Sequence, residues 1–182
     1  MPEEVSQPGD YTLIAARFNK TVQKYFAIVE SSAELENRQF LFRLYQILPD
    51  LISQAIRLPD IELADDEDPD RPGTRRTHEE WKKLYEQMKT KLGESDLYWQ
   101  VFDPTKDTEV IRGTLADDIS DIYGDLRLGA MHLKDSAGAC REAIWIWRLQ
   151  FLSHWGKHAI DALRTIHFLG ADFPVMPDAL DT

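Results

Sequence analysis

Apolar residues recur every three to four positions along most of the chain, the spacing that places them on one face of a helix. The pattern predicts helices over residues 11–30, 31–58, 77–93, 115–133 and 136–169. No segment has the alternation typical of a strand, and the aromatic segment 97–104 is predicted to be a packed connector. The sequence therefore predicts an all-α fold, a single-domain helical bundle of about five helices with a long C-terminal helix.

Polar residues mark the expected ends of these helices. Ser31 and Thr77 each precede a glutamate by three residues, which is capping-box spacing, and Thr114 is expected to cap the fourth helix. Pro49 lies inside the second helix and removes one backbone donor. We therefore expect a kink or a break at that position.

Residues 59–76 interrupt the helical pattern. They contain three prolines and a glycine, and seven acidic residues lie between positions 60 and 70. Such a composition predicts a solvent-exposed acidic loop between the second and third helices. One helical domain is expected over residues 11–170, between a flexible N-terminus (1–10) and a flexible C-terminal tail (171–182).

The overall charge excludes several classes of function. The chain has 32 acidic and 21 basic residues, a formal net charge of −11, and no basic stripe, so we expect no binding to nucleic acid. The single cysteine excludes a disulfide framework and a cysteine-based zinc site within one chain. No apolar run approaches the length of a membrane span, and the first thirty residues have no secretory pattern. We therefore expect a cytoplasmic protein that does not bind membranes.

Three aspartates follow one edge of the apolar face of the predicted fourth helix. Asp118, Asp121 and Asp125 are spaced i, i+3 and i+7, so their side chains project from the same side. The favourable interaction of an acid with a helix N-terminus fades within the first turn and does not explain Asp121 or Asp125. All three are candidate site residues.

A second polar stripe follows one edge of the predicted fifth helix. It consists of His154, His158 and Asp161, at i, i+4 and i+7. Two imidazoles four residues apart point the same way, which is the geometry by which a helix chelates zinc or iron. The glutamate that follows the first histidine in the zinc-protease motif is missing. The stripe is therefore a candidate metal site, but it does not match the zinc-protease motif.

Arg148 lies on the apolar face of the same helix, so its guanidinium is predicted to be mostly buried and to need an anionic partner. A short turn joins the fourth and fifth helices, which predicts antiparallel packing. Counting residues from this turn places Arg148 level with Asp121 and Asp125. We therefore predict a charge-assisted contact from Arg148 to one of them, with His154 or His158 close by.

These polar residues allow three interpretations. The favoured one is a structural polar seam in which Arg148 pairs with one of the three aspartates. The second is a divalent-metal site formed by Asp121, Asp125, His154 and His158. The third is a pocket for a small-molecule anion or nucleotide, centred on Arg148 and the histidines.

Several segments resemble one family. They are the aromatic segment 98–104, the aspartate segment 115–126, the Trp-Arg pair at 147–148, and the segment 154–163, which begins His-Trp-Gly. Together they resemble the bacterial domain-of-unknown-function family 5063, over residues 11–169. The resemblance implies a small all-helical bacterial protein and supplies no reaction.

No complete catalytic motif is present, so the leading functional hypothesis is a non-enzymatic binding or interaction module that needs no cofactor. Its partner would be a protein or a small molecule, and its contact patch would come from Tyr98, Trp99 and Phe102. The alternative is a divalent-metal-dependent hydrolase acting on a phosphorylated small molecule or nucleotide, which rests on analogy with other helical bundles. Nothing in the sequence predicts the oligomeric state.

Overall fold

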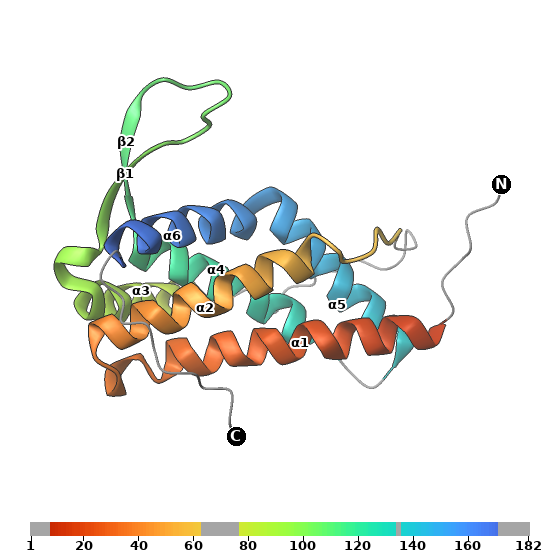
Figure 1. Ribbon diagram of the computed structural model, residues 1–182. Helices are drawn as coiled ribbons and strands as arrows, with labels where there is room; N and C mark the ends of the chain where they lie inside the picture. The colour runs from red at the N-terminus through yellow and green to blue at the C-terminus, as the bar shows by residue number, and fades with distance from the viewer. Residues whose placement is uncertain (1–7, 63–76, 134–135, 171–182) are drawn as a thin grey trace.

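The computed structural model describes residues 8–62, 77–133 and 136–170 of the chain. Its main elements are α1 (Pro8–Glu30), α2 (Asn37–Ala55), α3 (His78–Leu92), β1 (Leu97–Val101), β2 (Val110–Thr114), α4 (Leu115–His132), α5 (Ala137–Gln150) and α6 (Gly156–Leu169). Helix α4 contacts α1, α3, α5 and α6, so it lies at the centre of the bundle (Figure 1). The predicted all-α bundle is confirmed. Helix α1 begins at Pro8, so residues 8–10 of the predicted flexible N-terminus are helical. Residues 1–7, the predicted C-terminal tail from residue 171 and most of the predicted acidic loop lie outside the described residues.

The predicted long C-terminal helix continues from Ala137 to Leu169, and it contains a π-helical turn, η3 (Phe151–Trp155), between α5 and α6. The direction of the helix changes at this turn (Figure 1). A side chain at Gly156 would collide with the carbonyl oxygen of Phe151, so the turn requires a glycine there. Single π turns occur often at functional sites, and His154 lies within this one.

The segment predicted to be a packed connector is instead one strand of a hairpin. Strands β1 and β2 pair antiparallel, with Leu97 opposite Thr114 and Val101 opposite Val110. The hairpin projects from the bundle (Figure 1), and the side chains of Trp99 and Phe102 are 62% and 60% exposed. The prediction failed because apolar residues occupy both faces of β1 and hide the alternation that identifies a strand.

Two of the three predicted helix starts are confirmed. The Thr77 hydroxyl accepts a hydrogen bond from the Glu80 amide, and the Thr114 hydroxyl accepts one from the Asp117 amide. Ser31 does not cap α2, because its hydroxyl donates to the preceding turn of α1 and a 3₁₀ turn, η1 (Ser32–Glu34), intervenes.

Helix α2 continues through Pro49 to Ala55, so the chain does not break at the proline. Leu48 and Leu51, which lie on either side of it on the apolar face, are fully buried. Burial of this face stabilises the helix despite the missing backbone donor.

The packing of α4 against α5 centres on Trp147. Its indole is fully buried, donates a hydrogen bond to the carbonyl oxygen of Leu126 (2.9 Å), and meets the ring of Phe18 edge-on. The ring lies so close to Gly129 that a Cβ atom there would overlap it. A glycine at this position therefore sets how closely the two helices approach.

Replacing Gly129 with alanine is expected to lower the free energy of unfolding by about 1–3 kcal/mol, because the buried Trp147 ring has to move. Urea unfolding measures the effect. Gly138→Ala in α5 is the matched control, since no atom lies within 4 Å of the added methyl group. The control variant should be unchanged or slightly more stable, and equal losses in both variants would show that the contact with Trp147 is not the cause.

No helix in the described part of the chain is long and apolar enough to cross a membrane.

Candidate metal centre

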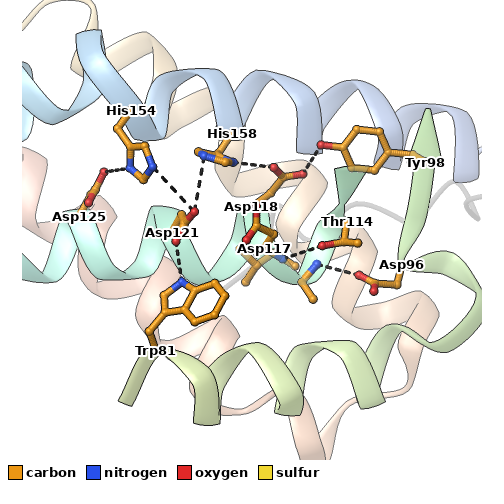
Figure 2. Close-up of polar contacts among 12 residues, drawn as sticks. Trp81, Asp96, Tyr98, Thr114, Asp117, Asp118, Asp121, Asp125, His154 and His158 are labelled. Carbon is orange, nitrogen blue, oxygen red and sulfur yellow. Dashed lines mark hydrogen bonds and ion pairs between the residues drawn. The ribbon is translucent and has the colours of Figure 1, made fainter. Parts of the chain in front are cut away.

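The two polar stripes face each other across the contact between α4 and the C-terminal helix (Figure 2). Asp118, Asp121 and Asp125 extend from α4 toward His154 in η3 and His158 in α6. The rings of the two histidines lie 4.9 Å apart between their centroids. Five of the seven candidate residues are thus brought together.

Each histidine is held by a carboxylate at its Nδ1 atom. His154 Nδ1 lies 2.7 Å from Asp125, and His158 Nδ1 lies 2.7 Å from Asp118. A carboxylate at Nδ1 favours the neutral tautomer that carries its proton there, which leaves the lone pair on Nε2. Both imidazoles are therefore oriented as metal ligands usually are.

The two Nε2 atoms face the same oxygen of Asp121. The distances to its Oδ2 atom are 3.8 Å from His154 and 3.6 Å from His158. Neighbouring ligand atoms around a tetrahedral zinc ion lie roughly 3.3 Å apart, given zinc–nitrogen bonds of about 2.0–2.1 Å. The two distances to Asp121 exceed this separation by only a few tenths of an ångström, and all three ligand atoms lie within 4.8 Å of one another.

Asp121 is fixed from a third helix. Its Oδ1 atom accepts a hydrogen bond of 2.6 Å from the indole nitrogen of Trp81 in α3, so Oδ2 remains directed at the histidines (Figure 2). The sequence gives no local signal for Trp81, because the contact joins positions 40 residues apart.

Asp118 is the most buried carboxylate of the site. Burial raises its pKa to about 6, against the hydrogen bonds from His158 and Tyr98, which lower it. Its Oδ2 atom accepts a hydrogen bond of 2.7 Å from the Tyr98 hydroxyl. Burial and the charge of Asp118 raise the pKa of Tyr98, so the phenol stays protonated and acts as a donor.

Asp117, which was not among the predicted site residues, also lies near the site. Its carboxylate, that of Asp118 and a nitrogen of His158 lie within 4.8 Å of one another. Burial raises the pKa of Asp117, and the charge of Asp121 adds to this effect. Asp117 precedes Asp121 by four residues, and this i, i+4 spacing was the sequence signal that the two side chains share one face of α4.

Comparison with known proteins assigns the chain to a family. The family model of DUF5063, a domain of unknown function, matches residues 9–172 of the chain. The chain belongs to this family.

The DUF5063 chain also resembles a solved structure, that of protein BF1032 from Bacteroides fragilis. The two are 23% identical, the match covers 93% of this chain and 92% of that one, and the TM-score is 0.63. At this identity the similarity establishes the fold alone. No curated protein matches the chain. The role of the DUF5063 site therefore has to be argued from its geometry.

The predicted contact of Arg148 with Asp121 or Asp125 is wrong. Its side chain is one-quarter exposed, and its guanidinium contacts Asp60 (3.3 Å) and the carbonyl oxygen of Leu58 (3.2 Å), beyond the end of α2. The neighbouring Trp147 occupies the face toward α4 and turns Arg148 away from it. The structural polar seam centred on Arg148 is therefore not formed in this DUF5063 chain.

Asp161 lies one turn beyond His158 but does not belong to either group of candidate ligands. It lines a groove between α6 and the hairpin, together with Lys157 and Arg164. Burial raises the pKa of Asp161, and the charges of these two basic residues oppose that effect.

Asp125→Asn is expected to lower the pKa of His154, because the hydrogen bond to Asp125 is the main cause of its raised pKa. The charged pair stabilises the metal-free protein fully below the unfolded-state pKa of about 6.5, and this contribution is lost as the pH rises through the raised pKa. An NMR titration of the imidazole resonances measures the change. The ring resonances of His167, near the end of α6, serve as the internal reference. An unchanged His154 titration would show that Asp125 does not hold it.

Proposed function

We propose that this DUF5063 chain binds a divalent first-row transition metal ion through Asp121, His154 and His158. The observation that carries the proposal is the convergence of two Nε2 atoms, at 3.6 and 3.8 Å, on one oxygen of Asp121. Both Nδ1 atoms are already held by carboxylates, an arrangement common around histidines that bind metal. In this proposal Asp125, a predicted metal ligand, instead orients His154.

The types of donor atom favour particular metals. Two imidazole nitrogens and one carboxylate oxygen suit Zn²⁺, Fe²⁺ or Co²⁺, whereas Mg²⁺ and Ca²⁺ prefer oxygen ligands throughout. Asp117, Asp118 and Asp125 lie around the three ligands and add negative charge, which favours a bound cation.

Calorimetric titration of chelator-treated protein with Zn²⁺ tests the proposal. The wild type should bind one equivalent, and Asp121→Asn, which removes the charged ligand with little change in shape, should bind much more weakly. Glu30→Gln is the matched control, because Glu30 also accepts a hydrogen bond from an aromatic side chain, the Tyr123 hydroxyl, outside the site. Absence of binding to the wild type, or equal binding by Asp121→Asn, would contradict the proposal.

A hydrolytic role is supported by the number of ligands. Three protein ligands leave one position of a tetrahedral ion for water, as in catalytic zinc sites. A cavity of about 470 Å³ lies beside Asp121 and Asp125 and gives room for a substrate. Its described lining contains no lysine or arginine, so it does not favour a phosphorylated substrate over a neutral one. Hydrolysis of ester and amide panels by the zinc-loaded protein, compared with Asp121→Asn, tests this role.

An interaction module is the second candidate function, and the exposed aromatic residues of the hairpin favour it. Trp99 and Phe102 are largely exposed, whereas Tyr98 is turned inward to Asp118 and does not add to the patch. A second copy of the chain is one partner that can be tested directly. Sedimentation velocity should show concentration-dependent association that is lost when both exposed residues are replaced by serine. A monomer at all concentrations would exclude self-association.

A further inference from the structure

We infer that Tyr98 is a positioning residue for the metal centre, through which the β1–β2 hairpin sets the orientation of His158. The inference rests on the proposed metal site and names the element of the fold that controls it. It joins the hairpin, which the sequence did not predict, to the metal site.

A continuous set of short hydrogen bonds connects the hairpin to the site (Figure 2). The Tyr98 hydroxyl donates to Asp118 Oδ2 at 2.7 Å, and Asp118 Oδ1 contacts His158 Nδ1 at 2.7 Å. The side chain of Asp118 is only 3% exposed, so solvent does not replace either partner readily. Both of its oxygens are engaged, and the hydroxyl therefore fixes the rotation of the carboxylate that holds the histidine.

The hairpin in turn fixes the hydroxyl. Tyr98 lies opposite Gly113 in the register of the two strands. A Cβ atom at position 113 would lie 2.5 Å from the Tyr98 ring, so the ring rests directly on the backbone of β2. The glycine therefore permits the ring position from which the hydroxyl reaches Asp118.

The base of the hairpin is anchored to α4, the helix that carries Asp118 and Asp121. The carbonyl oxygen of Asp96, just before β1, accepts a hydrogen bond from the Leu115 amide (2.9 Å). The Asp96 side chain accepts one from the Ala116 amide (2.8 Å). The hairpin and the metal site are therefore built on one frame, and a displacement of β1 is transmitted to His158 through Tyr98.

Tyr98→Phe tests the inference because it removes the hydroxyl and keeps the ring. Loss of a group that orients a metal ligand typically weakens metal binding by about 10–100-fold, and we expect a Zn²⁺ affinity lowered in that range. Tyr123→Phe is the matched control, because the Tyr123 hydroxyl donates at 2.6 Å to the carboxylate of Glu30, which is not one of the candidate ligands. The control should bind Zn²⁺ as the wild type does.

A second measurement separates this inference from the proposed function. In the metal-free protein at fixed pH, Tyr98→Phe should shift the NMR resonances of the His158 ring, and Tyr123→Phe should leave them in place. A wild type that binds Zn²⁺ while Tyr98→Phe changes neither affinity nor resonances would overturn the positioning role. Shifted His158 resonances in a chain that binds no Zn²⁺ would support the link from hairpin to histidine and overturn the metal proposal instead. If the wild type binds no Zn²⁺ and Tyr98→Phe leaves the His158 resonances unchanged, both the metal proposal and the positioning role of Tyr98 are wrong.

Discussion

The variant His158→Gln is expected to bind Zn²⁺ more than about 100-fold more weakly than the wild type. Altering a group that only orients a ligand costs about 10–100-fold in affinity, and His158 is a proposed ligand itself. Its imidazole also contacts both Asp118 (2.7 Å) and Asp121 (3.6 Å). Glutamine keeps a polar side chain of similar length but does not offer the imidazole nitrogen that divalent zinc prefers. Competition with a chromophoric chelator measures the two affinities.

His167→Gln is the matched control for this experiment. His167 lies on the same helix, α6, and its Nδ1 atom contacts the Tyr45 hydroxyl at 3.0 Å, outside the proposed site. The His167→Gln variant should therefore bind Zn²⁺ with wild-type affinity. Equal affinities for His158→Gln and the wild type would remove His158 from the ligand set.

Trp147→Ala is expected to lower the free energy of unfolding by about 3–5 kcal/mol, the usual cost of removing a large buried aromatic side chain. Its indole is fully buried, packs edge-on against Phe18 at 5.0 Å between centroids, and fills the space above Gly129. The variant leaves a cavity between α4 and α5 and removes the indole hydrogen bond to the carbonyl oxygen of Leu126. Denaturant unfolding followed by circular dichroism measures the loss.

The corresponding control is Trp99→Ala on the hairpin. This tryptophan is 62% exposed, and its described contact is with the guanidinium of Arg112, at 5.2 Å from the ring centroid. An exposed contact of this kind contributes about 0.5–1 kcal/mol. Similar losses in the two tryptophan variants would contradict the central place of Trp147 in the core.

The helices and much of the site follow from local spacing. The 3.6-residue periodicity identified each helix, and the caps at Thr77 and Thr114 gave two of the starts. The aspartates on α4 and the histidines on the C-terminal helix were found because i, i+3 and i+4 neighbours share a helix face. That the two stripes meet depended only on antiparallel packing across a short turn.

The remaining features depend on contacts between elements far apart in the sequence. Arg148 was misplaced because its neighbour Trp147 takes the face toward α4, which depends on the space left by Gly129. Trp81 and Tyr98 reach the site from α3 and β1, and no periodicity along α4 indicates which side chains approach it. The π turn that carries His154 depends on backbone hydrogen bonding, which apolar spacing does not reveal.

Addition of Co²⁺ to the metal-free protein, followed by visible absorption, tests the proposed three-ligand site most directly, because the spectrum reports the donor atoms and the coordination number together. We expect intense absorption of low-coordinate Co²⁺ that saturates at one equivalent, disappears on addition of Zn²⁺, and is absent from Asp121→Asn. A spectrum that remains that of hydrated Co²⁺ at every ratio would contradict a metal centre at Asp121, His154 and His158.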